Sequence, residues 1–153
     1  MIKNVEATIR EYIKDIIHMS LATTVNNKPW VCEVHFAYDA NLNLYFMSLP
    51  TRRHSLEISQ NPNVSGNIIV QHTEGQKPRG VYFEGTAELL KNVTNEDPAY
   101  KALSERFGRG EEMLEDATKD DGHKFYKITV SKYYLFDSRE SSPSTKYELD
   151  WKK

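Results

Sequence analysis

The chain has 153 residues, of which 39% are hydrophobic and 27% are charged, and this length and composition fit one globular domain over residues 1–153. Its formal net charge at pH 7 is −2, which gives no electrostatic basis for nucleic-acid binding. Its single cysteine, Cys32, excludes an intrachain disulfide and a cysteine-based zinc site. The N-terminal run MIKNVEATIREYIKDII lacks the apolar core of a signal peptide, and no apolar run approaches the ~20 residues that span a bilayer, so we expect a cytoplasmic protein without a membrane partner.

The first predicted element is an amphipathic helix over roughly residues 2–16, where apolar residues recur at spacings of three and four. Two strands follow, HMSLATTV and WVCEVHFAY, separated by the turn NNKP. Strict alternation places one set of side chains on a single face of the second strand: Trp30, Cys32, Val34, Phe36 and Tyr38. Glu33 and His35 lie on its other face, where they contact each other, a ligand or only solvent.

Turn-forming segments divide the rest of the chain into further elements. After the turn DANLN we expect the strand LYFMS, the short helix TRRHSLEISQ and then the strands NVSGNIIVQ and VYFEGTAELL. A helix that opens at Asp97 and Pro98 follows, and then the charged and partly helical segment GRGEEMLEDATKDDG. The last predicted elements are the long strand HKFYKITVSKYYLFDS, the loop RESSPST and a short strand in KYELDW. Gly85 is expected to mark a β-bulge, and the long strand to bend near Ser131.

The order of these elements predicts a mainly β fold with flanking helices. Most of the strands follow one another through short turns, so we expect them to be antiparallel neighbours. About six such strands commonly close into a barrel, because closure removes exposed sheet edges.

The helix TRRHSLEISQ opens with three potential cations, Arg52, Arg53 and His54. A helix start carries a partial positive charge, and cations there cost up to about 1 kcal/mol each. With Thr51 as N-cap, free backbone N–H groups and converging arginine side chains would form a phosphate site. The alternative is a solvated helix start whose arginines point into water.

Other kinds of site have little support in the sequence. The five histidines lack the spacing of a metal-binding pair, so we expect no metal. The chain has no G-x-S-x-G elbow, no G-x-G-x-x-G and no Walker loop. Cys32 lies on the apolar face of its strand, where a small buried hydrophobe is expected rather than a nucleophile.

The run LYFMSLPTRRHSLEISQNPNVSGNI resembles the pyridoxamine 5′-phosphate oxidase-like superfamily, the flavin-binding split barrels. Its pattern is a strand, a small polar residue, a basic pair that opens a helix, and Asn-Pro-x-Val at the next strand. The resemblance extends through MSLATTVNNKPWVCEVHFAYD and RGVYFEGTAELL, so it covers roughly residues 15–91. It implies a six-stranded antiparallel split barrel from a small uncharacterised branch of the superfamily.

The resemblance also implies a set of residues that bind FMN. The strand residues expected along the isoalloxazine ring are Cys32, Val34, His35, Phe36 and Ala37. Met47 and Ser48 match positions beside the ribityl phosphate, and Arg53 and His54 match the basic pair that holds it, with Thr51 and Arg52 adjacent. Arg79 and Gly80 match the region where a residue of the partner subunit reaches the flavin. The family is typically a homodimer with two flavins at its interface, which fits a two-fold contact.

Two departures from the family pattern bear on function. The second basic position is usually lysine, whereas here it is His54; a neutral imidazole still donates a hydrogen bond but pairs more weakly with phosphate above a pH of about 6.5. Arg52 is the candidate to compensate. The segment SKYYLFDSRESSPSTK has no counterpart of the Arg and His pattern with which the true oxidase holds its pyridoxal substrate, so we do not expect vitamin B6 oxidation.

We therefore expect an FMN-dependent oxidoreductase that acts on a small-molecule redox substrate, with NADH or NADPH as a candidate electron donor. The cofactor would supply the redox chemistry. Two alternatives stay open: a non-catalytic flavin- or haem-binding carrier or sensor on the same barrel, and a cofactor-free barrel.

Overall fold

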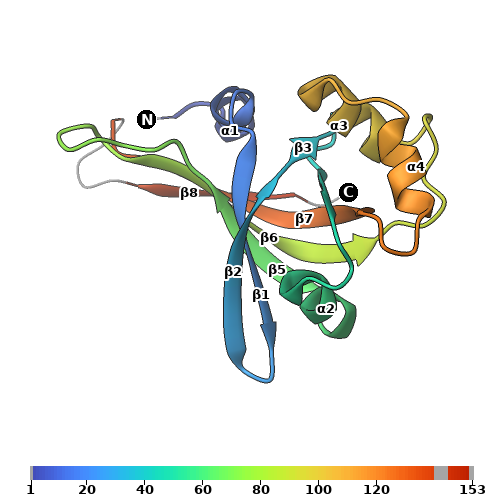
Figure 1. Cartoon of the computed structure of the whole chain (residues 1–153). Coiled ribbons are helices and arrows are strands. Elements are labelled where there is room, and N and C mark those ends of the chain that lie inside the picture. The colour runs from blue at the N-terminus through green and yellow to red at the C-terminus, as the bar shows by residue number, and fades with distance from the viewer. Residues whose placement is uncertain (1, 140–144, 152–153) are drawn as a thin grey trace.

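The computed structural model describes residues 2–139 and 145–151 of the chain (Figure 1). Its helices are α1 (Val5–Ile13), α2 (Arg53–Gln60), α3 (Pro98–Phe107) and α4 (Glu112–Thr118). Its strands are β1 (His18–Val25), β2 (Lys28–His35), β3 (Ala37–Tyr38), β4 (Leu44–Ser48), β5 (Asn63–Ile68), β6 (Arg79–Leu89), β7 (Lys124–Asp137) and β8 (Lys146–Asp150). The predicted loop RESSPST falls mostly on residues 140–144, outside the described residues.

The described strands form one antiparallel sheet in the order β2-β1-β5-β6-β7-β4-β3, with β8 paired to β7. The strands at the two ends of this order come from a single stretch of chain, 28–38, interrupted at Phe36. The sheet therefore curls toward itself as a split barrel (Figure 1). The predicted fold class is confirmed, but the expected count of six strands was too low.

The strand count differs for a local reason. The backbone N–H of Phe36 donates a hydrogen bond to the Ile17 carbonyl oxygen at 3.0 Å, and the side chain of Phe36 is fully buried. This bond continues the register of β1 with β2 by one residue, and the next two residues pair with β4 instead. One predicted strand thus becomes β2 and β3, and the short strand predicted in KYELDW is present as β8.

Two apolar clusters hold the layers together. The larger one fills the curled sheet beneath α1, and its fully buried members include Ile9, Ile13, Phe36, Phe46, Phe83 and Tyr133. The smaller one joins α3 and α4 to β3, β4 and β7 through Ala37, Tyr45, Ala99, Leu103, Met113 and Phe125. Burial of each large apolar side chain contributes roughly 1.5–3 kcal/mol. The smaller cluster therefore fixes the two helices beside the barrel (Figure 1).

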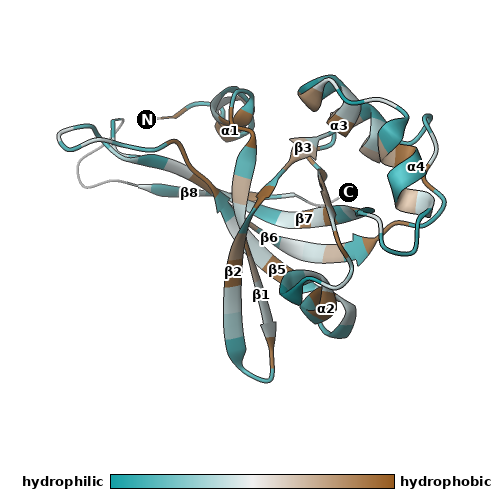
Figure 2. Ribbon diagram, in the orientation of Figure 1, coloured by the Kyte–Doolittle hydropathy of each residue, from teal (hydrophilic) through white to brown (hydrophobic). Residues whose placement is uncertain are grey.

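The turns of the chain are hydrophilic, as expected for exposed segments, but strand β2 also exposes apolar side chains. Hydrophilic colour marks the turn between β1 and β2, whereas apolar colour appears further along β2 (Figure 2). Val31 of β2 is 60% exposed, and Trp30 beside it is 38% exposed. Within the described ranges no helix is long and apolar enough to cross a membrane.

The helix boundaries correct two predictions. Helix α1 is shorter than the predicted 2–16, because the Asn4 side chain accepts from the N–H of Ala7 at 2.9 Å and caps the helix there. The prediction of Thr51 as the N-cap of α2 is wrong. The N–H of Arg52 donates to the Leu49 carbonyl oxygen at 3.1 Å, which closes a turn and places Arg52 at the N-cap position.

The predicted irregularity in the longest strand pair is confirmed. Glu84 pairs with Lys132, but Gly85 pairs with Val130, so Ser131 is the extra residue of a β-bulge. The Ser131 hydroxyl donates to the Glu84 carbonyl oxygen at 3.1 Å. A Cβ on Gly85 would overlap the carbonyl oxygen of Thr129 and lie 2.9 Å from Cα of Val130, so the strands approach closely only because this residue is glycine.

We expect Gly85→Ala to lower the free energy of unfolding by about 1–3 kcal/mol, because the added methyl group forces two backbones apart. Urea unfolding followed by tryptophan fluorescence measures this change. Thr86→Ala, at an exposed position on the same strand, is the matched control. Equal midpoints for the two variants would contradict the close approach.

Candidate cofactor-binding site

A cavity of about 680 Å³ lies between the barrel and the helices α3 and α4. Ligand sites typically have volumes of roughly 300–1,000 Å³. The barrel side of its lining consists of Glu33, Val34, His35, Met47, Ser48, Leu49, Arg52 and His54. The helical side consists of Leu103, Phe107, Arg109, Glu112, Met113, Asp116 and His123. Elements far apart in the sequence therefore supply the two sides.

A buried polar pair marks the end of the cavity beside α2. Oγ of Ser48 lies 2.7 Å from Nε2 of His54, and both residues are less than 10% exposed. Burial, together with the nearby charge of Arg52, lowers the pKa of His54. The imidazole is therefore neutral at pH 7 and shares one hydrogen bond with the Ser48 hydroxyl, which leaves this pair able to bind a further polar group.

The two arginines at the start of α2 diverge. Arg53 donates from Nε to Oε2 of Glu57 at 2.8 Å, and its guanidinium lies 4.3 Å from the ring centroid of Trp30. Arg52 instead lines the cavity. The expected convergence of both arginines is wrong, because adjacent helical residues point to different faces and Arg53 meets the carboxylate one turn later.

Glu57 connects this ion pair to the barrel. Its Oε1 accepts a hydrogen bond at 2.8 Å from the buried hydroxyl of Thr23. The hydrogen bond from Arg53, followed by that from Thr23, lowers the pKa of Glu57. Arg53 therefore neutralises a carboxylate one turn further along α2, and that carboxylate binds the barrel through Thr23. The role of Arg53 in this geometry is structural.

The predicted ring-binding strand contributes only in part. Val34 and His35 line the cavity, and the imidazole of His35 stacks on Phe107 of α3 with ring centroids 5.5 Å apart. Phe36 and Ala37 are instead buried in the two apolar clusters. Cys32 is half-buried, and burial raises the pKa of its thiol to about 11, as suits a small packed side chain.

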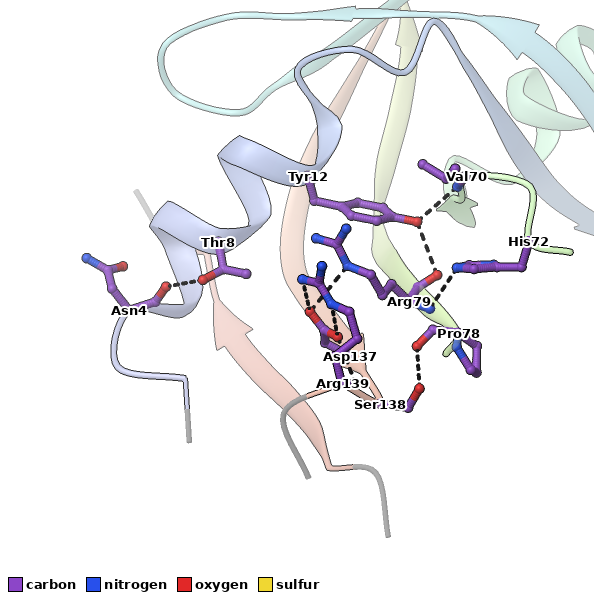
Figure 3. A network of polar contacts seen from close by, with 10 residues as sticks. All are labelled: Asn4, Thr8, Tyr12, Val70, His72, Pro78, Arg79, Asp137, Ser138 and Arg139. Atoms are coloured by element: carbon purple, nitrogen blue, oxygen red, sulfur yellow. Dashed lines mark hydrogen bonds and ion pairs between the residues drawn. The ribbon is translucent and has the colours of Figure 1, made fainter. Parts of the chain in front are cut away.

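Arg79 and Gly80 begin β6 and are not among the residues that line this cavity. Figure 3 shows Arg79 among its own polar partners. Arg79 borders a separate cleft of about 430 Å³. Its Nε lies 3.3 Å from the fully buried carboxylate of Asp137, which also accepts from Arg139 at 2.9 and 2.8 Å. Burial raises the pKa of Asp137, but the hydrogen bonds from Arg139 lower it overall. The contact of Arg79 with a partner's flavin stays a prediction.

The same cleft shows how α1 is tied to the sheet (Figure 3). The hydroxyl of Tyr12 accepts from the N–H of Val70 at 2.9 Å and donates to the carbonyl oxygen of Arg79 at 3.1 Å. The N–H of Arg79 donates to Nε2 of His72 at 3.1 Å. These bonds order the entry to β6.

Sequence reasoning missed the helical side of the cavity, above all Phe107, Arg109, Asp116 and His123. Oδ2 of Asp116 accepts from Nδ1 of His123 at 3.0 Å and from its backbone N–H at 3.1 Å. The segment that contains Asp116 is highly charged, so its composition indicated a solvated surface. Only the return of the chain from α4 into β7 brings these two side chains together.

Arg106 fixes the position of this helical side. Its Nη2 donates to the carbonyl oxygens of Ile13, at 3.1 Å, and of Ile16. Its guanidinium also lies 5.1 Å from the ring centroid of Phe36 and 5.2 Å from that of Tyr38. The end of α3 is thereby attached to the end of α1 and to the junction between β2 and β3.

Within residues 2–139 and 145–151, no group of three His, Cys, Asp or Glu side chains gathers to hold a metal ion. The cavity instead combines apolar walls, such as Leu103 and Met113, with a few polar groups. Such a combination suits a largely organic ligand.

The fold and the matched residues define a split barrel of the pyridoxamine 5′-phosphate oxidase class. The family model for pyridoxamine 5′-phosphate oxidase matches residues 5–137, and the chain belongs to this family. The resemblance predicted from the sequence is confirmed.

Individual proteins show the same relationship. A UPF0306 protein of Haemophilus ducreyi is 27% identical over 135 residues, which cover 87% of this chain and 82% of that protein. A heme binding protein from Mycobacterium smegmatis superposes with a TM-score of 0.75 and 14% identity, covering 99% of this chain and 60% of that one. An FAD-binding protein from Mesorhizobium loti has a TM-score of 0.66 and 18% identity, covering 96% of each chain. At these identities the two structures show a shared fold.

The Glu57 contacts predict how stability depends on pH. The folded-state pKa of Glu57 is lowered, so its contribution is present above the unfolded value of about 4.5 and is lost as the pH falls through the folded value. Arg53→Met should therefore destabilise the protein at pH 7, and the difference from wild type should shrink below about pH 4.

Urea unfolding at pH 7, 5 and 3.5 measures this difference, and Lys28→Met, at an exposed position on β2, is the control. A difference between Arg53→Met and wild type that stays constant over this range would show that Arg53 and Glu57 are not coupled.

Proposed function

We propose that this chain is an FMN-dependent oxidoreductase whose cofactor binds in the cavity between the barrel and α3–α4. The observation that carries the proposal is the polar end of that cavity, next to the start of α2. Arg52 and the paired Ser48 and His54 line the cavity there. In the described part of the chain no side chain caps this helix end. Such an end favours a phosphate group.

The other side chains of the cavity fit the remainder of the cofactor. Val34, Met47 and Phe107 supply apolar surface for a planar ring. The three carboxylates in the lining have polar partners of their own. Glu33 lies 3.3 Å from His18, Glu112 accepts from the N–H of Gly110 at 2.9 Å, and Asp116 is paired with His123. Each of these carboxylates is thus held by a hydrogen bond or polar contact, and the guanidinium groups of Arg52 and Arg109 supply the positive charge in the lining.

The bound cofactor would supply hydride transfer. The chain would bind its phosphate through Arg52, Ser48 and His54. Val34 and His35 would orient the ring, and Leu103 and Phe107 would exclude water. We propose that a small-molecule substrate enters the same cavity, with NADH or NADPH as the candidate donor.

We further propose that the protein is a homodimer with its two cavities at the interface. Trp30 and Val31 expose apolar surface on β2, the strand that also lines the cavity. A two-fold contact over β2 would remove this surface from water. The Arg79 cleft would then be available to the cofactor of the partner.

The alternative function is a non-catalytic carrier or sensor of a flavin or haem. One observation favours it: three histidines, His35, His54 and His123, line the cavity, and imidazole is a common axial ligand of haem iron. The similarity to a heme binding protein points in the same direction.

Arg52→Ala should weaken FMN binding about tenfold to a hundredfold, because a charge-assisted phosphate contact contributes roughly 1.5–3 kcal/mol. Arg53→Ala should change the Kd by less than about threefold, since Glu57 and Trp30 hold that guanidinium. Quenching of FMN fluorescence on titration with cofactor-free protein measures both. Riboflavin, which lacks the phosphate, should bind wild type and Arg52→Ala equally. A larger loss in Arg53→Ala would restore Arg53 to the phosphate site.

The visible spectrum separates the enzyme from the carrier. We expect the purified protein with added FMN to retain a flavin spectrum after gel filtration and to be bleached anaerobically by NADPH or NADH. A retained flavin that neither nucleotide bleaches would favour the carrier. A haem spectrum after addition of hemin, with no retention of FMN, would refute the flavin proposal.

A further inference from the structure

A second polar pair lies on the helical side of the cavity, where Asp116 of α4 meets His123 just before β7. Nδ1 of His123 lies 3.0 Å from Oδ2 of Asp116, and both residues line the cavity. None of the phosphate-binding side chains proposed above belongs to this pair. It therefore adds a separate chemical group to the site.

The turn after α4 is built to bring the two side chains together. The N–H of Gly122 donates to the carbonyl oxygen of Lys119 at 3.1 Å, and Nζ of Lys124 donates to that of Ala117 at 2.7 Å. Gly122 is buried, and a Cβ there would overlap the Asp116 carbonyl oxygen and lie 2.9 Å from Oδ1. The chain can return close to Asp116 only because this residue is glycine.

The hydrogen bond determines which nitrogen of His123 is available. Burial raises the pKa of Asp116, but its bonds from His123 lower it overall, so the group is a carboxylate at neutral pH. A carboxylate can only accept, and Nδ1 must therefore carry the proton. Nε2 is left to exchange a proton, and imidazole is the side chain that does so near neutrality.

Other charged groups surround the same space. Glu112 and Arg109 belong to the helical side with His123, while Arg52, His54, Glu33 and His35 belong to the barrel side. His54 is buried and held neutral, whereas the side chain of His123 is 52% exposed beside a carboxylate. The two imidazoles thus lie in contrasting environments. Such a contrast commonly gives two titratable groups in one site different roles, here ligand binding for His54 and proton transfer for His123.

We propose that His123, oriented by Asp116, holds the proton that accompanies reduction of a molecule bound in this cavity. The inference rests on the proposed function. It assigns the substrate to compounds with a C=O or C=N group. A reduced cofactor bound here would supply the hydride for the new C–H bond and would itself be oxidised. His123, as the imidazolium with protons on both ring nitrogens, would give its Nε2 proton to the substrate oxygen or nitrogen as the π electron pair becomes the O–H or N–H bond. The neutral Nδ1–H imidazole that remains would then take a second proton from water.

The first measurement uses the cofactor-free protein and nitrogen-resolved NMR of the histidine rings. Neutral His123 should show the Nδ1–H tautomer in wild type. Asp116→Asn should lose this preference, because an amide can also donate. Asp120→Asn removes an exposed acid from the same turn and should leave the tautomer unchanged. An Nε2–H tautomer in wild type would overturn the proposal.

The second measurement follows the His123 ring signal against pH in FMN-loaded protein, oxidised and then photoreduced. The added negative charge should move its titration midpoint upward by at least about half a pH unit, which is roughly threefold tighter proton binding. Asp120→Asn should behave like wild type, and His123→Gln identifies the signal by its loss.

The outcomes separate the two proposals. If wild type binds no FMN, the proposed function fails and this inference fails with it. If FMN binds but reduction leaves the His123 midpoint unmoved, the inference alone is refuted.

Discussion

The site depends on one junction, at which the chain passes from β2 to β3 through Phe36 and the guanidinium of Arg106 lies against the Phe36 ring. The ring of Phe36 is buried and its backbone N–H still bonds to Ile17 beside β1, whereas the two residues that follow pair with β4 at the other end of the strand order. Arg106 then ties α3 to the same place through the carbonyl oxygens of Ile13 and Ile16. Because one side of the cavity is β2 and the other is α3–α4, this junction sets the distance between them.

The arginines at the start of α2 show how neighbouring identical side chains acquire different tasks. Arg53 stabilises the buried carboxylate of Glu57, which in turn binds Thr23 of the barrel. A buried acid without its cation would be costly, so Arg53 is committed to holding α2 in place. Arg52, one residue earlier, remains beside the cavity. The helix is thus anchored by one cation while it presents the other to a ligand.

Much of the fold could be predicted from local patterns. The Asp97–Pro98 helix start and the bulge at Gly85 each depend on residues close in sequence, and each lies where predicted. The start of α2 was misplaced because the turn from Leu49 to Arg52 competes with a Thr51 cap, and no single residue reveals that competition. The helix after Asp97–Pro98 was also predicted, but no feature of the sequence indicated that α3 and α4 form one side of the cavity.

The sequence by itself determined the order of helices and strands, the family and the basic start of α2, because these follow from side-chain periodicity and short motifs. Only the tertiary structure decided which cation faces the cavity and that Asp116 meets His123. Those outcomes depend on how the elements pack. Glu57 binds both Arg53 and Thr23 of β1, which fixes the orientation of α2, and the turn at Gly122 brings the start of β7 close to α4. Local sequence patterns do not predict the distances between these side chains, because the packing of the whole core fixes them.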